Sequence, residues 1–226
     1  DVAPDPKIAA RGAELAKPIE AIKQEVVGQS AGVIDGAAGS CRLGECAMGN
    51  LVTDAMLDRV RDLGVAIALT NGGGLRASIG PGDVTMGDVL TVLPFQNTLS
   101  TFIATGAEII DALENGVSQV EDRKGRFPQV SGLRFEWDPA MGPNEGRIRS
   151  VEVAEGEGWV PIDPEKHYGV ATNDYVRQGG DGYRVFEIAE NAYDYGPGLE
   201  QVVADYLTAL GAPYEPYTDG RIRRAE

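Results

Sequence analysis

The stretch Val65-Ala66-Ile67-Ala68-Leu69-Thr70-Asn71-Gly72-Gly73-Gly74-Leu75-Arg76 places an apolar run directly before a glycine turn. Five apolar residues in succession are typical of a buried strand. Glycines lack a Cβ, so the turn can adopt positive φ and a ligand can approach its N–H groups. Asn71 offers amide donors and an acceptor, and Arg76 offers a planar fork that suits a phosphate. We predict a pocket edge for a flat, polar, anionic ligand; a plain tight turn before a surface arginine is the alternative.

Composition and charge narrow the class of protein. The chain has 226 residues, 42% of them hydrophobic and 24% charged, which is enough for one good core or two small ones. Its 35 acidic and 20 basic residues give a net charge of -15, which disfavours nucleic acids and anionic membranes. No apolar run approaches the ~20 residues of a membrane span. We therefore expect no nucleic-acid partner and no membrane segment, and a small anion would need locally placed arginines.

Two cysteines lie close together, Cys41 and Cys46, in Cys-Arg-Leu-Gly-Glu-Cys. Their spacing favours a small disulfide loop and hence an oxidising compartment, although free thiols and a metal site remain alternatives. A structural zinc needs four ligands, and the chain adds only one histidine, His167, which we interpret as a half-buried strand residue. The chain starts at Asp1 rather than Met, which suggests a processed or excised piece of a longer protein.

The remaining pattern mixes helices and strands. Asp5 caps the first expected helix and Pro18 ends it, while Thr105 and Glu108 form a capping box. Helices are expected at residues 6–16, 47–63, 83–93, 105–120 and 199–210, ended at Gly64 and Gly211 where glycine follows. Strands are expected at 22–34, 65–69, 99–104, 131–137, 147–153, 168–173 and 220–222, with a loop at 36–40. We find no repeat and no dividing linker, and predict a single α+β domain.

Three further segments carry candidate binding residues. Arg42 precedes the helix at 47–63, whose N-terminus would attract an anion. Phe95 follows Leu93-Pro94, in a turn where a ring more often packs in the core. The Tyr175 ring could stack on a base, a contact worth roughly 1–3 kcal/mol, and the Asp181 carboxylate could accept from ribose hydroxyls. A solvated arginine and an ordinary Asp-Gly turn are the plain alternatives, but the whole set is what a nucleoside monophosphate needs.

These motifs together resemble the C-terminal domain of the 5'-nucleotidase family, which includes bacterial periplasmic UDP-sugar hydrolase/5'-nucleotidase and animal ecto-5'-nucleotidase. The resemblance rests on residues 41–51, 71–76, 93–97, 127–132 and 179–183. It implies a layered sandwich of mixed β-sheets covered by helices over residues 1–226.

The resemblance also implies a division of labour. Members of the family are secreted two-domain hydrolases that convert nucleoside 5'-monophosphates to nucleoside and phosphate. An N-terminal metallophosphoesterase domain with two divalent metal ions, of the Zn or Mn type, does the chemistry, and the C-terminal domain binds the substrate. The implied roles are phosphate contact for Arg42 and Arg76, base hydrogen bonding for Asn71, base stacking for Phe95 and Tyr175, ribose binding for Asp181, and a disulfide between Cys41 and Cys46.

Some residues depart from the family pattern. Tyr175 stands where many members have Phe, and Gln178 stands where Asn is frequent. The single histidine fits no metal motif, so a dinuclear metal site or a His-Asp phosphatase dyad cannot be built from this chain. We expect no phosphatase activity from the chain alone, and a periplasmic or extracellular parent enzyme. Alternatives are a hydrolase of UDP-sugars, 2',3'-cyclic nucleotides or a sulfur-carrier conjugate, and a stand-alone nucleoside-binding module.

Overall fold

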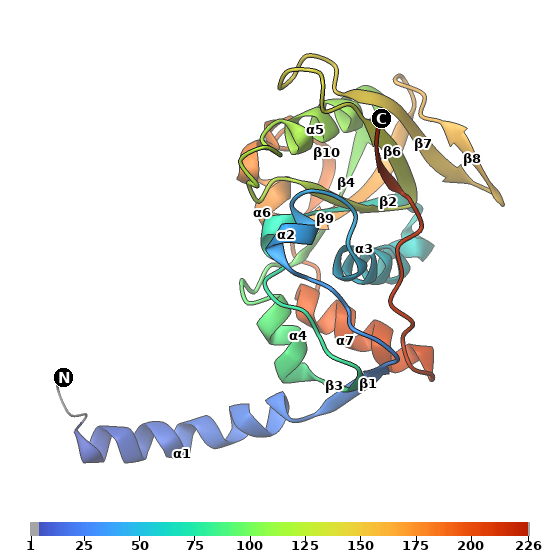
Figure 1. Ribbon diagram of the computed structural model, residues 1–226. Coiled ribbons are helices and arrows are strands. Elements are labelled where there is room, and N and C mark those ends of the chain that lie inside the picture. The colour runs from blue at the N-terminus through green and yellow to red at the C-terminus, as the bar shows by residue number, and fades with distance from the viewer. Residues whose placement is uncertain (1–4, 226) are drawn as a thin grey trace.

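A five-stranded mixed sheet forms the centre of the molecule in the computed structural model, which describes residues 5–225 (Figure 1). Its strand order is β10-β4-β9-β2-β5. These strands span Glu190–Tyr193 (β10), Leu99–Thr105 (β4), His167–Asn173 (β9), Val65–Asn71 (β2) and Pro128–Ser131 (β5). In β2, Ala68 belongs to one buried cluster while Ile67 and Leu69 belong to the other. The predicted strand is confirmed, and it is buried because both faces of the sheet are covered.

Helices cover one face of this sheet. The helix α3 (Ala47–Val60) packs on β2 and β5, and α7 (Leu199–Leu210) packs on α3. The helix α4 (Met86–Val92) and a two-stranded sheet of β1 (Val26–Ser30) and β3 (Gly82–Thr85) lie beyond them. Figure 1 shows α3, α4 and α7 together on this side of the molecule.

The opposite face carries the helix α5 (Gly106–Val117) and a four-stranded sheet in the order β11-β6-β7-β8. These strands span Ile222–Arg224, Leu133–Trp137, Ile148–Glu155 and Gly158–Pro161. Gly132 joins β5 to β6 with a φ of 70°, and a Cβ there would lie 2.0 Å from the Ala66 carbonyl oxygen. Mixed sheets covered by helices confirm the predicted α+β class. Short helical turns complete the fold: α2 (Ala38–Cys41), α6 (Asp174–Arg177), η1 (Arg61–Leu63), η2 (Gly72–Gly74), η3 (Gly180–Gly182) and η4 (Arg184–Phe186).

Local signals at helix ends are confirmed where they involve direct hydrogen bonds. Asp5 Oδ1 accepts from the N–H groups of Lys7 and Ile8. The Thr105–Glu108 capping box is present. Gly64 and Gly211, with φ of 76° and 63°, follow the last helical residues of η1 and α7. Capping side chains at the start and left-handed glycines at the end therefore mark these helix boundaries.

Five expectations about local structure are wrong. The helix α1 runs over Pro6–Lys23 and continues through Pro18, so the strand expected at 22–34 shrinks to β1. Much of α1 is exposed and projects from the body, so water can bond the carbonyl that Pro18 leaves without a donor. The helix expected at 83–93 begins at Met86, because β3 pairs with β1. The expected loop at 36–40 contains α2, and His167 is exposed rather than half-buried.

Candidate functional site

The candidate binding site is a cleft of about 480 Å³ at the end of β2, where several loops from distant parts of the chain meet. It contains most of the residues that the sequence predicted for binding. The lining residues are Arg42, Asn71, Gly73, Gly74, Phe95, Asn97, Gly125, Tyr175 and Asp181. Arg76 is the one predicted site residue outside this lining. The fold thus brings together residues that lie up to 139 positions apart in the chain, from Arg42 to Asp181.

The glycine turn after β2 forms one wall of the cleft. The N–H groups of Gly72 and Gly73 donate to the carbonyl oxygens of Phe127 and Gly125, each at 2.7 Å. A Cβ on Gly72 would lie 2.1 Å from the Cys41 carbonyl oxygen. None of Gly72–Gly74 has positive φ, so that part of the prediction is wrong. Gly72 and Gly73 are needed because backbone of Cys41 and Gly125 approaches the turn closely.

The Cys41–Cys46 disulfide is present, which confirms the predicted pairing over free thiols or a metal site. Its loop rests on Gln129, a fully buried side chain of β5. Gln129 Nε2 donates to the carbonyl oxygens of Cys41 at 3.0 Å and Gly44 at 2.7 Å, and Oε1 accepts from Cys46 N at 3.2 Å. One amide side chain therefore satisfies three backbone groups of the loop that carries Arg42.

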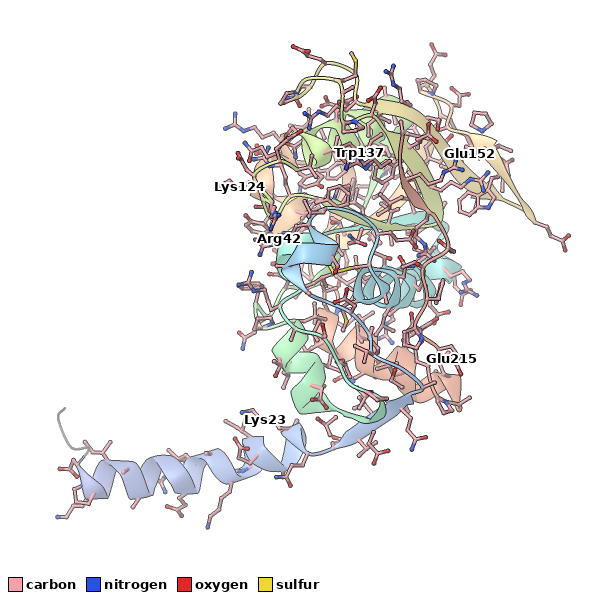
Figure 2. All side chains as sticks on the ribbon, viewed as in Figure 1. Lys23, Arg42, Lys124, Trp137, Glu152 and Glu215 are labelled. Atoms are coloured by element: carbon pink, nitrogen blue, oxygen red, sulfur yellow. A yellow bond between two sulfur atoms is a disulfide. The ribbon has the colours of Figure 1, made fainter. Side chains whose placement is uncertain are left out.

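Arg42 reaches the cleft from this loop without help from a helix N-terminus. Cys46 Sγ accepts from Gly49 N at the start of α3, and a Cβ on Gly49 would lie 2.1 Å from Gln129 Oε1. These side chains cover the end of α3, so the expected anion site at that N-terminus is wrong. Arg42 Nη1 donates to the Arg123 carbonyl at 3.4 Å. Arg42 and Lys124 lie on the same side of the molecule in Figure 2.

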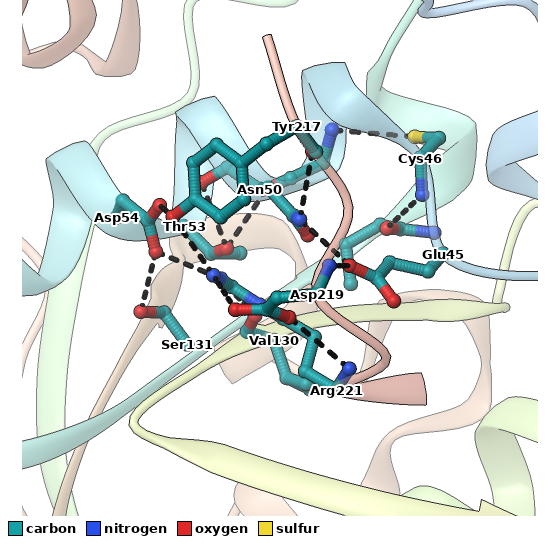
Figure 3. A network of polar contacts seen from close by, with 12 residues as sticks. Glu45, Cys46, Asn50, Thr53, Asp54, Val130, Ser131, Tyr217, Asp219 and Arg221 are labelled. Carbon is teal, nitrogen blue, oxygen red and sulfur yellow. Dashed lines mark hydrogen bonds and ion pairs between the residues drawn. The ribbon is translucent and has the colours of Figure 1, made fainter. Parts of the chain in front are cut away.

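The C-terminal segment holds the other side of the disulfide loop (Figure 3). Glu45, inside that loop, accepts from the N–H groups of Asp219 and Gly220 at 2.8 and 2.9 Å. Nearby, Arg221 bonds Asp54 at 2.8 Å and also bonds the carbonyl of Val130. The loop is therefore fixed both to the central sheet and to the end of the chain.

Two aromatic rings stand in the cleft. Phe95 and Tyr175 are 56% and 45% exposed, so the alternative that Phe95 packs in the core is wrong. The Arg76 guanidinium lies 5.8 Å from the centroid of the Phe95 ring, a cation–π geometry. Its Nη1 also donates to the Gly73 carbonyl at 3.3 Å. Arg76 thus borders the cleft behind Phe95 instead of lining it.

Asp181 lies in a strained turn between flanking glycines. Its φ is 54°, a left-handed value that costs a non-glycine residue on the order of 1 kcal/mol. Asn71 Nδ2 donates to Oδ2 at 2.7 Å, and the Tyr175 hydroxyl donates to Oδ1 at 3.1 Å. The Asn115 amide donates to the Asp181 carbonyl at 3.2 Å. Burial, and next the Asp181 charge, raise the pKa of Tyr175 above its ordinary 10.0, so its hydroxyl remains a donor at neutral pH.

Sequence reasoning did not assign a role to several residues that build the site. Gln129 and Asn97 lie inside motifs quoted for the resemblance, so a signal existed for both. Asn173 is buried behind Asn71, to which its Nδ2 donates at 3.1 Å. Gly125 meets Gly73 only in the folded chain, and nothing in its local sequence indicates this contact.

We also searched the described residues for metal sites and for membrane-spanning helices and found neither. Between residues 5 and 225, His, Cys, Asp and Glu side chains form no group of three or more that could hold a metal ion. None of the helices described there is both long and apolar enough to cross a membrane. The cleft is singled out because it collects five of the six predicted binding residues.

Comparison with known proteins assigns the chain to a family. Residues 26–188 match the model of the family described as "5'-nucleotidase, C-terminal domain". The chain belongs to this family. It is 40% identical over 207 residues to the trifunctional nucleotide phosphoesterase protein YfkN of Bacillus subtilis, covering 91% of this chain and 14% of that protein.

Solved structures show the same fold. A 5'-nucleotidase precursor from Thermus thermophilus matches with a TM-score of 0.89 and 41% identity over 98% of this chain and 44% of that one. The NAD nucleotidase of Haemophilus influenzae matches with a TM-score of 0.81 and 27% identity over 97% of this chain and 41% of that one. The chain thus spans less than half the length of these relatives.

Proposed function

We propose that this chain is the nucleotide-recognition domain of a secreted 5'-nucleotidase that hydrolyses nucleoside 5'-monophosphates. The observation that carries the proposal is the meeting of Arg42, Asn71, Phe95, Tyr175 and Asp181 in one cleft. A cleft with two exposed rings, an amide, a carboxylate and an arginine can bind a base, a ribose and a phosphate at once. Membership of the family supports this reading.

Each group has a proposed role that follows from its chemistry. The rings of Phe95 and Tyr175 hold the base by stacking, and Asp181 accepts hydrogen bonds from the ribose hydroxyls. Arg42 binds the phosphate, and Arg76 supports both Phe95 and the phosphate charge. Asn71 donates one amide N–H to Asp181, and its amide oxygen accepts from Asn173. Its second N–H is the donor proposed for the base.

Catalysis is proposed to lie outside this chain. The described residues do not fit a dinuclear metal site, so no chemical step is assigned to them. In the proposed parent enzyme an N-terminal metallophosphoesterase domain would hold two divalent ions, of the Zn or Mn type, and these would activate the attacking water. This chain binds and orients the nucleotide, and positioning of this kind contributes much of a rate enhancement. The Cys41–Cys46 disulfide supports a periplasmic or extracellular location.

The test is a calorimetric titration of the 226-residue chain with AMP, adenosine and inorganic phosphate in metal-free buffer. We expect saturable AMP binding with a Kd of about 1 mM, and a several-fold loss in Arg42→Ala and Phe95→Ala. Arg11→Ala, on the exposed helix α1, is the matched control and should bind like the wild type.

Other outcomes separate the alternatives. If the chain binds UDP-glucose but not AMP, a UDP-sugar hydrolase is favoured. Another nucleotide is a further alternative, because relatives are named as a trifunctional nucleotide phosphoesterase and an NAD nucleotidase. Metal-dependent phosphate release from AMP by the pure chain would contradict the proposed division of labour.

A further inference from the structure

The Asp181 carboxylate is held by two side chains whose orientation the hydrogen-bond network determines. Asn173 Oδ1 accepts from the backbone N–H of Val176 at 2.8 Å, so the other end of that amide is its donor. The Asn173 amide nitrogen donates to Asn71 Oδ1 at 3.1 Å. The nitrogen of Asn71 must then face Asp181, where it donates to Oδ2 at 2.7 Å. Asn173 is 1% exposed, so this chain of amides is rigidly anchored in the core.

The Tyr175 hydroxyl is fixed by the same logic. It accepts from the backbone N–H of Asp181 at 3.1 Å, so its own proton is directed to Asp181 Oδ1, also at 3.1 Å. The Tyr175 ring packs against the turn, since a Cβ on Gly180 would lie 2.6 Å from two ring carbons. A phenylalanine would keep the ring contact but could make neither hydrogen bond.

Both carboxylate oxygens of Asp181 therefore accept one hydrogen bond from the protein. An ionised carboxylate has about four acceptor positions, two on each oxygen. Within residues 5–225 no other side chain donates to either oxygen, so one position per oxygen is left, in the carboxylate plane that Asn71 and Tyr175 hold. Two neighbouring hydroxyl groups can donate one bond to each oxygen, whereas a sugar with a single hydroxyl leaves one oxygen without its second donor.

We propose that the Tyr175 hydroxyl is a positioning group that makes the cleft selective for a vicinal diol, and hence for ribonucleotides over deoxyribonucleotides. The inference rests on the proposed function and adds a specificity determinant to it. The Tyr175 ring then contributes stacking in the cleft, while its hydroxyl aligns the carboxylate that binds the sugar.

The test compares AMP with 2'-deoxy-AMP and 3'-deoxy-AMP on the wild-type chain and on Tyr175→Phe. In the wild type we expect AMP to bind about tenfold more tightly than either deoxynucleotide, the effect of one hydrogen bond to a charged acceptor. In Tyr175→Phe we expect AMP affinity to fall about fivefold while deoxynucleotide affinity stays within about twofold, so the preference largely disappears. Tyr193→Phe, at an exposed hydroxyl that donates to the Tyr195 carbonyl, is the matched control and should keep the wild-type preference.

The outcomes separate this inference from the proposed function. If Tyr175→Phe lowers the affinities for AMP and for the deoxynucleotides equally, the hydroxyl has a merely structural role and the inference is overturned. An unchanged preference for AMP would overturn it as well. Both results would leave the proposed nucleotide binding in place. Failure of the wild type to bind AMP would instead overturn the proposed function together with the inference. Thermal unfolding of each variant checks that the fold is retained.

Discussion

At the scale of single residues, Gln129 links the core to the site. Its amide satisfies three backbone groups of the disulfide loop, and its side chain also covers the start of α3. A buried backbone group without a partner costs about 1–3 kcal/mol. The position of Arg42 therefore depends on an amide that lies beneath it and not in the cleft.

We predict that Gln129→Met lowers the free energy of unfolding by about 3 kcal/mol, because a similar volume is kept while the hydrogen bonds are lost. Urea unfolding measures the effect. Gln24→Met, at an exposed position at the end of α1, is the control and should stay within ~0.5 kcal/mol. A loss equally small at Gln129 would show that the loop holds its shape without this amide.

The sequence predicted which residues meet in the cleft better than how they interact. Residue types and spacing selected Arg42, Asn71, Phe95, Tyr175 and Asp181, because each type has a chemistry that suits a nucleotide. Their proposed roles toward a ligand stay predictions. The Asn71–Asp181 hydrogen bond joins residues 110 positions apart, and no local pattern encodes such a contact. The positive φ expected for the glycine turn was wrong for the same reason: Gly72 and Gly73 are required by backbone from distant segments, which the local sequence does not show.

At the scale of elements, local signals located those helices whose ends carry their own caps. The helices α5 and α7 were predictable because Thr105, Glu108 and Gly211 act within one turn of the boundary. The strand β3 was not, because Gly82–Thr85 becomes a strand only by pairing with β1. The prediction that Pro18 ends the first helix was wrong, because an exposed helix tolerates the missing N–H donor better than a buried one.

Contacts of the C-terminal segment connect several elements, so we expect their loss to destabilise more of the fold than the loss of a surface ion pair. Arg221, with its side chain 8% exposed, pairs with Asp54 on α3, whose side chain is 14% exposed. It also bonds Asp219 and Tyr217, and so joins the last strand to α3 and to the central sheet. Removing one partner of a buried pair leaves the other charge uncompensated.

We predict that Arg221→Met lowers the free energy of unfolding by about 3 kcal/mol or more. Arg59→Met is the matched control: Arg59 pairs with Asp205, but these side chains are 47% and 44% exposed, so its loss should be below about 1 kcal/mol. Chemical denaturation of both variants compares them directly. Equal losses would mean that burial of the Arg221 pair contributes nothing.

At the scale of the whole molecule, acid should destabilise the fold. Hydrogen bonding to Arg177 holds the pKa of Asp194 below its ordinary 3.8, and Arg147 does the same for Glu121, whose ordinary value is 4.5. Because the folded pKa values are lower than the unfolded ones, the stabilisation is present above the unfolded values and is lost as pH falls through the folded ones. Relief of repulsion among the excess acidic charges acts in the opposite direction, and salt screens it.

We therefore predict a free energy of unfolding that is nearly constant from neutral pH to about pH 5.5 and declines below about pH 4.5. Urea titrations across this range in moderate salt measure it. Asp194→Asn should weaken the acid dependence, since it removes one of the titrating groups. Stability that increases as pH falls below 4.5 would show that relief of charge repulsion dominates over the loss of these ion pairs.

We propose that AMP binds in the cleft between the glycine turn and the Asp181 turn. The most direct measurement is a two-dimensional amide NMR titration of the isotope-labelled chain with AMP. We predict that the largest shifts occur at the amides of Gly73, Gly74, Gly125 and Asp181, which line the cleft. A second groove lies between β1 and α7, with Val27 and Leu207 in its lining. Largest shifts in that groove, or no shifts at saturating AMP, would contradict binding in the cleft.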